Sequence, residues 1–277
     1  MEAVEGRVEA DPGLFGPGSI TWRVHGDPAM ALGGLRALML QSVHPLAMAG
    51  VAQHSSYRSD PWGRLFRTAD YVATMTYGTM DEVRAAAARV RRVHEGLHGV
   101  EPESGRAYRV EDPALLLWVH CAEVDSFLSA YKRFGGSLRR GEADAYVAEQ
   151  VRAAALIGIP AEDVPASEGQ LRAYFRSVRP SLRSTAESRA ALWFLFNPPM
   201  PLPARPAWLT LTSLAFATLP RWARRRFGWA AALTAHPGTD LAAAMGGRSL
   251  TTLLRLVPQR VRTSPARRAA LERVEDR

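Results

Sequence analysis

The chain has 277 residues and a hydrophobic content of 47%, which is enough for one large core but short for two full enzymatic domains. Its single cysteine, Cys121, excludes an internal disulfide and a structural zinc finger, since both need several thiols. The net charge of +8 is carried almost wholly by arginine, and because no recognised nucleic-acid-binding module accompanies it, we expect no nucleic-acid partner.

Helical periodicity recurs along the chain, and no convincing run of alternating apolar and polar residues interrupts it. The sequence therefore predicts an all-α protein with one globular domain over 19–277, preceded by a loose arm over 1–18. The arm mixes acidic residues with glycine and proline and lacks the pattern of a secretory leader. Together with the single cysteine, this predicts a cytoplasmic protein.

The first predicted helix covers about 29–55 and contains Pro45 within an otherwise apolar stretch. Proline removes a backbone donor and frees a carbonyl one turn earlier, so we expect the helix to kink there. His44 lies at this kink. Two interpretations stay open for it: a residue of a functional pocket, or a core histidine whose hydrogen bonds are satisfied.

The next predicted helix, over 61–77, places Arg64, Arg67 and Thr68 on one face. Two guanidinium groups and a hydroxyl in this arrangement could hydrogen-bond a bound oxygen species or the carboxylates of a cofactor. The alternative interpretation is a helix start that carries two solvated surface arginines.

The remaining elements follow from periodicity and cap residues, and they are a helix over 80–98, a loop over 100–111, and helices over about 113–134, 142–157, 167–177, 184–196, 206–219, 221–233, 238–246, 248–256 and 264–275. Thr79 and Glu82 form a capping box before the first of these helices, and Gly99 stands where a C′ glycine belongs. His120 lies on an apolar stripe and is either a pocket residue or a satisfied core histidine.

The stretch VHEGLHG spells H-E-x-x-H with His94, Glu95 and His98. One interpretation is a zinc hydrolase in which both histidines bind the metal, Glu95 activates water and Glu123 is the third ligand. However, His94 lies within the apolar stripe of its helix while Glu95 points elsewhere. A satisfied core histidine, or a ligand of a different metal, also fits this pattern.

Four segments occur in the order QSVHPLAMAGVAQHS, DPWGRLFRT, VRRVHEGLHG and DPALLLWVHCAEVDS. In this order they resemble the family that contains bacterial rubber oxygenase (latex-clearing protein) and the fungal oxygenase MpaB. Each motif is short, but their order and spacing together are specific, and the resemblance covers about residues 20–260. It implies an all-helical fold that carries haem b.

The resemblance also implies roles for individual residues. His94 matches the proximal haem ligand of rubber oxygenase, a histidine in a V-R-x-x-H helix, and Arg64 and Thr68 match residues on the distal side. The lysine beside that threonine is replaced by Arg67. A guanidinium has no usable lone pair, so a closed state with this side chain on iron is not expected. The acidic residue thought to act as base in rubber oxygenase has no match, which favours a small apolar substrate over rubber.

The resemblance thus predicts a haem b-dependent oxygenase that acts with dioxygen on a small apolar substrate, with a redox partner as a further candidate. Arg58 and Arg67 are candidates for the haem propionates, His120 for contact with the cofactor, and His44 for the pocket. A zinc hydrolase and a haem-binding protein without turnover remain as alternatives. In RWARRRFGW, residues 221–229, arginines and aromatics interleave as on membrane-surface helices, although a solvated basic face beside a core tryptophan is the simpler explanation.

Overall fold

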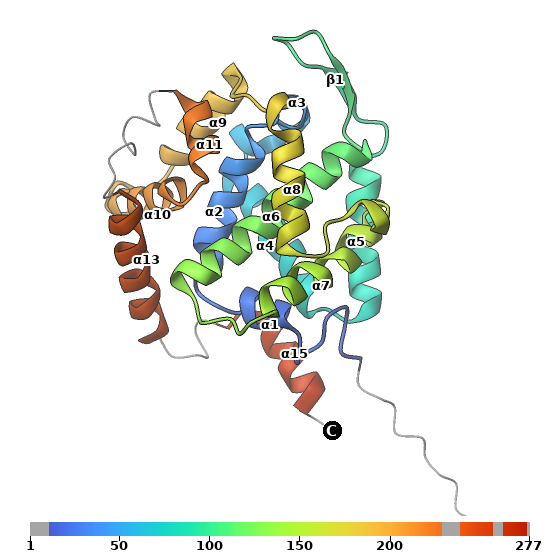
Figure 1. The fold of residues 1–277 in the computed structure, drawn as a ribbon, viewed down its shortest axis with the longest axis vertical. Helices are drawn as coiled ribbons and strands as arrows, with labels where there is room; N and C mark the ends of the chain where they lie inside the picture. Colours follow the sequence, from blue (N-terminus) through green and yellow to red (C-terminus); the bar gives the residue numbers. More distant parts are fainter. Residues whose placement is uncertain (1–10, 229–238, 257–262, 276–277) are drawn as a thin grey trace, which may run out of the picture.

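The computed structural model describes residues 11–228, 239–256 and 263–275, and helices make up most of this part of the chain (Figure 1). The α-helices are α1 (Ile20–His25), α2 (Met30–Gln41), α3 (Pro45–His54), α4 (Pro61–Tyr77), α5 (Met80–His94), α6 (Pro113–Phe134), α7 (Glu142–Leu156), α8 (Glu168–Val178), α9 (Ala186–Phe196), α10 (Arg205–Ala217), α11 (Arg221–Arg224), α13 (Thr239–Leu256) and α15 (Pro265–Glu275). Short 3-10 turns are η1 (Ser56–Arg58), η2 (Ala161–Asp163), η3 (Arg179–Ser181), η4 (Leu202–Ala204) and η5 (Arg225–Phe227), and the strands are β1 (His98–Val100) and β2 (Ala107–Arg109). The predicted all-α fold is confirmed.

α6 runs through the middle of the other helices, and its apolar face contributes to the main core. α2 packs along α6, and α10 and α13 cover the outer side of this pair (Figure 1). Trp118 and Phe134 of α6 and Tyr146 of α7 are among the largest fully buried side chains. Burial of one large apolar side chain contributes about 1.5–3 kcal/mol of transfer free energy, so this core holds the helices together.

The predicted helix over 29–55 is wrong, because the chain forms two helices there, α2 and α3, with a break between them. His44 is extended, with φ −92° and ψ 115°, as a residue before proline prefers. Pro45 then takes the first position of α3, where its missing N–H costs nothing. Nδ1 of His44 accepts a hydrogen bond from the Ala47 N–H at 3.3 Å and so caps α3.

α4 and α5 pack as an antiparallel pair, and the predicted bounds of α4 are confirmed. The predicted capping box of α5 is also confirmed, since Thr79 Oγ1 accepts the Glu82 N–H at 3.3 Å and the Glu82 carboxylate accepts the Thr79 N–H at 2.8 Å. Only Gly78 and Thr79 separate the two helices. The first turns of α4 and the last turns of α5 therefore meet at the same end of the pair.

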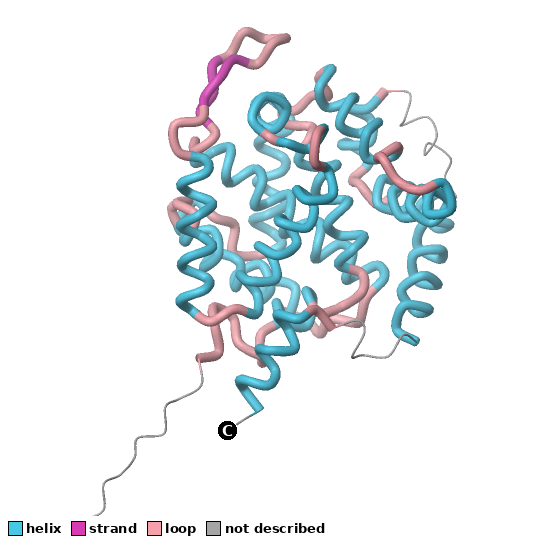
Figure 2. Tube along the Cα trace, turned by 180° about the vertical axis from the view of Figure 1, so that it is seen from behind, coloured by secondary structure: helices cyan, strands magenta, loops and turns pink. Residues whose placement is uncertain are grey.

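α5 ends at His94, four residues earlier than predicted, and the expected loop over 100–111 contains a strand. Gly96 adopts a left-handed conformation with φ +73°, which turns the chain away from the helix axis. β1 and β2 then pair as an antiparallel hairpin, which projects from the helices and is magenta in Figure 2. Strands of three residues are too short for alternation to be a signal in the sequence.

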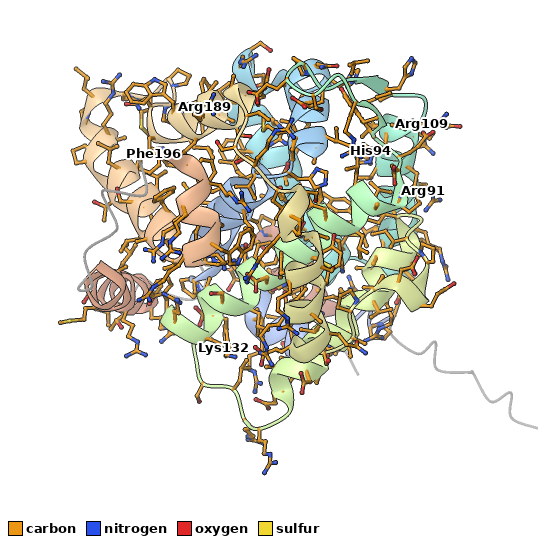
Figure 3. All side chains as sticks on the ribbon, turned by 45° about the horizontal axis from the view of Figure 1, so that its top comes forward. Arg91, His94, Arg109, Lys132, Arg189 and Phe196 are labelled. Carbon is orange, nitrogen blue, oxygen red and sulfur yellow. The ribbon has the colours of Figure 1, made fainter. Side chains whose placement is uncertain are left out.

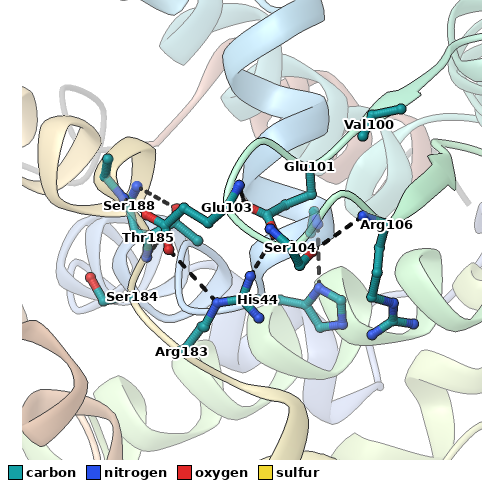
Figure 4. Close-up of polar contacts among 12 residues, drawn as sticks. His44, Val100, Glu101, Glu103, Ser104, Arg106, Arg183, Ser184, Thr185 and Ser188 are labelled. Carbon is teal, nitrogen blue, oxygen red and sulfur yellow. Dashed lines mark hydrogen bonds and ion pairs between the residues drawn. The ribbon is translucent and has the colours of Figure 1, made fainter.

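A buried carboxylate fixes the loop between the two strands to the helices (Figure 4). Glu101 is fully buried and accepts the backbone N–H groups of Glu103 and Ser104, both at 2.9 Å. Its Oε2 also forms an ion pair with Arg183 at 2.5 Å. Arg183 donates its backbone N–H to the Val43 carbonyl at 3.0 Å, and so the hairpin loop is held beside the start of α3.

The C-terminal part differs from prediction in two places. The break predicted between 238–246 and 248–256 is absent, because residues 239–256 form the single helix α13. A Cβ on Gly247 would lie 2.2 Å from the Phe134 ring, so this glycine allows close packing on α6 and does not end a helix. Of the helix predicted over 221–233, the structure shows the short α11 and η5, and residues 229–233 lie outside the described part.

Residues 11–18 of the predicted N-terminal arm pack against the α4 and α5 pair. Leu14 is buried in a cluster with Val83 of α5. The carboxylate of Asp11 accepts the Met80 N–H at 2.6 Å, at the start of the same helix. Residues 1–10 of the arm lie outside the described part of the chain, so the predicted division between arm and domain stays a prediction.

Candidate functional site

A cavity of about 1090 Å³ lies between α3, α4, α5 and α6 and follows the length of α4. Its wall is mostly apolar, and α5 contributes the small side chains Ala85 and Ala86. Sites for small molecules and cofactors usually measure roughly 300–1,000 Å³, so this cavity has room for a large guest. Ionisable side chains in its wall include His25, Arg64, Arg67, Tyr71, Arg89, His94, His120 and Glu123.

His94 is the last residue of α5 and lines the cavity at the end where α4 begins. Figure 3 shows it on the same helix as Arg91 and on the side of the molecule that carries Arg109. Burial lowers the pKa of the His94 imidazole, so the ring is neutral near pH 7. Neither ring nitrogen has a hydrogen-bond partner among the described residues. The site therefore presents a neutral imidazole that can bind a metal ion.

Arg64 lies one turn into α4, at the level of His94 across the antiparallel pair, and it lines the same cavity. Its Nε donates a hydrogen bond to Ser55 Oγ at 2.8 Å, and no carboxylate of a described residue pairs with it. Burial, and secondly the nearby Arg67, lower the pKa of its guanidinium. A largely buried cation without a counter-ion is suited to receive an anion or a partly charged oxygen.

Thr68 and Arg67 lie at the exposed part of the cavity wall. Thr68 Oγ1 donates to the Arg64 carbonyl at 2.9 Å, so its hydroxyl proton is already used, while its lone pairs remain available as acceptors. Arg67 forms an ion pair with Asp60 at 3.0 Å. Arg58 is not among the cavity-lining residues, and its guanidinium stacks on the neighbouring tyrosine ring at 5.1 Å from the centroid.

The two histidines left open by the sequence have different surroundings. His44 caps α3, packs against the Trp118 ring at 5.6 Å between centroids, and is not among the residues that line the cavity. Burial, and secondly Arg106, lower its pKa to about 4. His120 does line the cavity, and burial alone lowers its pKa to about 4. It has no hydrogen-bond partner in the described part of the chain.

Glu123 lies one turn after His120 on α6 and also faces the cavity. Burial raises the pKa of its carboxyl to about 7, and no described residue forms a hydrogen bond or ion pair with it. Tyr71 of α4 and Tyr146 of α7 lie near enough for its charge to raise their pKa values, in addition to their burial. From sequence, Glu123 is a candidate only as a zinc ligand, although its spacing from His120 on an apolar stripe is a signal for a shared cavity.

The geometry contradicts the zinc-hydrolase interpretation. H-E-x-x-H binds zinc only when one continuous helix brings both histidines to the same face, and α5 ends at the first of them. His98 lies on β1, is exposed, and its Nδ1 contacts the Gly96 carbonyl at 2.8 Å. Glu95 is exposed and outside the cavity wall. Within the described ranges, no group of three His, Cys, Asp or Glu side chains could hold a metal ion.

His25 is a cavity residue that the sequence analysis missed. Its Nδ1 contacts Thr76 Oγ1 at 2.8 Å and its Nε2 contacts Tyr146 Oη at 3.0 Å, so both nitrogens are used. Burial lowers its pKa to about 3. No motif surrounds His25 in the sequence, and only the packing of α1 against α4 and α7 reveals its position.

The basic segment over 221–229 places its described aromatic residues inward. Phe227 is buried in the core, and the Trp222 ring packs against Phe175 at 6.1 Å and against the guanidinium of Arg179 at 5.0 Å. Residue 229 lies outside the described part. Among the described residues, no helix has the length and apolar character that a bilayer crossing requires.

Comparison with known families gives one match. The family model described as ER-bound oxygenase mpaB/B′/rubber oxygenase, catalytic domain, matches residues 22–256. The matched region contains α2 to α13 and so all the helices that enclose the cavity between His94 and Glu123. No curated protein and no solved structure matches the chain.

Proposed function

The chain belongs to the family of the ER-bound oxygenase mpaB/B′ and rubber oxygenase catalytic domains, and from this premise we propose that it is a haem b-dependent oxygenase. Membership of this family supports an oxygenase activity, without specifying the cofactor or the substrate. Haem as the cofactor, His94 as its ligand and a small apolar molecule as substrate are the parts that we add. Dioxygen is the second substrate, and a redox partner supplies electrons where only one oxygen atom is inserted.

His94 is the observation that carries the proposal. Its neutral imidazole lines a large, mostly apolar cavity, and a ring nitrogen without a partner among the described residues would be available to hold haem iron. The cavity volume of about 1090 Å³ accommodates a large planar group and leaves space beside it. That remaining space favours an oxygenase over a haem-binding protein without turnover. The residues present therefore fit the cofactor.

Bound haem b would supply an iron that activates dioxygen. The chain's own residues would provide the environment for this chemistry. Arg64 holds the two terminal NH₂ groups of its guanidinium at the level of His94, where they can donate hydrogen bonds to an oxygen that gains negative charge. Thr68 fixes the backbone of the same turn through its bond to the Arg64 carbonyl. The apolar wall excludes water from the reacting atoms.

Three further residues enter the proposal in supporting roles. Arg67 is the candidate partner of a cofactor propionate, because it lines the exposed part of the cavity and its present partner, Asp60, is itself exposed. Arg58 has no contact with the cavity in this structure and stays a weaker candidate for the same task. His44 acts as a positioning residue, since its cap fixes the start of α3, whose side chains line the cavity.

The test is the absorption spectrum of the protein purified from cells with adequate haem. We expect a coloured protein with a Soret band and a haem-to-protein ratio close to one. A colourless protein that does not take up added haem would overturn the proposal.

A further inference from the structure

The cavity contains two polar side chains that neither the fold nor the iron site uses. His120 and Glu123 lie three residues apart on α6, so both project toward the same face of the helix, and both line the cavity. Neither has a hydrogen bond or ion pair to a described residue. Both side chains are half-buried, and their polar atoms face the cavity, so they are free to hydrogen-bond a polar group of a bound molecule.

Other polar side chains nearby show that the fold can satisfy such groups. Asp125, two residues after Glu123, pairs with Arg36 at 2.7 Å. His25, in the wall of the same cavity, uses both ring nitrogens. The hydroxyls of Tyr57 and Tyr77 in the cavity wall also lack partners, but His120 and Glu123 are the unpaired acceptor and donor that lie one turn apart on one helix.

Glu123 lies along the cavity from the proposed iron site. Tyr71 lies close enough to Glu123 for the carboxylate charge to raise the pKa of the tyrosine. Tyr71 follows Arg64 by seven residues on α4, which is a distance of roughly 10 Å along the helix. The cavity wall as a whole is mostly apolar, although α4 also contributes Arg67, Thr68 and Asp70 between these two levels. A guest that contacts both levels must be elongated and apolar, with one polar end.

We propose that Glu123 and His120 form a polar subsite for the oxygen-bearing end of such a substrate, an alcohol or carbonyl compound whose apolar part extends toward Arg64 and His94. The proposal rests on the proposed oxygenase function and names its substrate class. Burial raises the pKa of the Glu123 carboxyl to about 7, so its protonated form is populated at neutral pH and can donate a hydrogen bond, and the neutral imidazole of His120 can accept one. His120, which the family resemblance suggests as a cofactor contact, would in this subsite contact the substrate.

Calorimetric titration of the purified protein with 1-octanol, n-octane and octanoate tests the subsite. We expect 1-octanol to bind about five- to tenfold more tightly than n-octane, the factor that one net hydrogen bond supplies. Glu123→Leu should remove this preference, and Glu123→Gln, whose amide still donates, should retain part of it. Glu95→Gln makes the same chemical change outside the cavity and should leave binding unchanged.

Several results would overturn the subsite: equal affinity for 1-octanol and n-octane in the wild type, a preference that survives Glu123→Leu, or a stronger preference for octanoate. Glu123→Gln is nearly isosteric and keeps the test decisive if the leucine variant does not fold. The Soret band is read on the same samples. Haem uptake without an alcohol preference would remove only the subsite, whereas an alcohol preference without haem uptake would support the subsite and overturn the proposed function.

Discussion

Two histidines in the cavity wall differ in how their ring nitrogens are paired. At the end near α1, His25 is held by Thr76 and Tyr146, and both of its ring nitrogens are used. At the end where α4 begins, the imidazole of His94 has no described partner and Arg64 has a single hydrogen bond. Paired groups stabilise the fold, whereas unpaired groups become satisfied only when a molecule binds. The comparison separates residues that serve structure from residues that serve chemistry.

Replacement of His94 should have the largest effect, because it removes the only ligand that we propose for iron. We expect His94→Ala to abolish stable axial ligation and the normal Soret band. The haem-to-protein ratio and the absorption spectrum measure this result. Glu95→Gln should leave both unchanged, and His98→Ala should lower haem content only modestly, since both side chains are exposed. Equal loss in all three variants would contradict the assignment.

Arg64→Ala should keep haem and reduce turnover about a hundredfold, since a donor to a developing negative charge contributes roughly 3 kcal/mol. Thr68→Val should reduce turnover less, because the hydroxyl proton of Thr68 already points to the Arg64 carbonyl. Steady-state rates with a substrate, at equal haem content, provide the measurement. Wild-type rates in Arg64→Ala would show that the unpaired guanidinium has no part in the reaction.

Glu123 should make stability depend on pH. Burial raises the pKa of its carboxyl from 4.5 to about 7, so the folded state holds this proton more tightly than the unfolded state does. The carboxyl's contribution to the free energy of unfolding is fully present below pH 4.5 and is lost as the pH rises through 7. Each unit of difference between the folded-state and unfolded-state pKa corresponds to about 1.4 kcal/mol. Between pH 5 and pH 8, the wild type should lose roughly 1–3 kcal/mol relative to Glu123→Gln.

Urea unfolding of both proteins at the two pH values measures that difference. The subtraction is needed because His25, His44 and His120 have lowered pKa values and act in the opposite direction, losing stability as the pH falls below 6.5. Parallel pH profiles for the wild type and Glu123→Gln would show that the carboxyl is not held in its protonated form.

The smallest expected effect is a difference in the free energy of unfolding between variants of two histidines in the same cavity. His25→Leu leaves the buried hydroxyl of Tyr146 without its partner and should lower the free energy of unfolding by roughly 1–3 kcal/mol. His120→Leu breaks no hydrogen bond and should change stability by less than about 0.5 kcal/mol, or increase it. Chemical denaturation of the two variants tests this contrast, and similar losses in both would remove the distinction between the paired and the unpaired histidine.

Local signals predicted the elements whose ends are determined by nearby residues. The capping box of Thr79 and Glu82 fixes the start of α5, and the bounds of α4 follow from Pro61 and its capping aspartate, Asp60. The end of α5 was beyond prediction, because Gly96 turns the chain three residues before the more conspicuous Gly99.

The candidate site was predicted only in part, because nearby residues do not determine all of its contacts. The motifs indicated Arg64, Thr68 and His94, and the structure places all three in the wall of one cavity. Which polar groups lack partners depends on contacts between distant segments. The pairing of His25 with Tyr146, 121 residues away, and the isolation of Glu123 follow from helix packing, which sequence periodicity does not specify.

The alanines of α5 that line the cavity also set the size of molecule that the protein can admit. α4 has 17 residues and is about 25 Å long. Because the cavity follows α4, its length limits the length of an extended molecule that can bind in it. Ala85 and Ala86 keep the cavity open. Leucine is nearly as good a helix former as alanine, so Ala86→Leu should preserve α5 while it obstructs the cavity. The small side chains of α5 would thus limit which molecules fit beside α4, separately from any catalytic role.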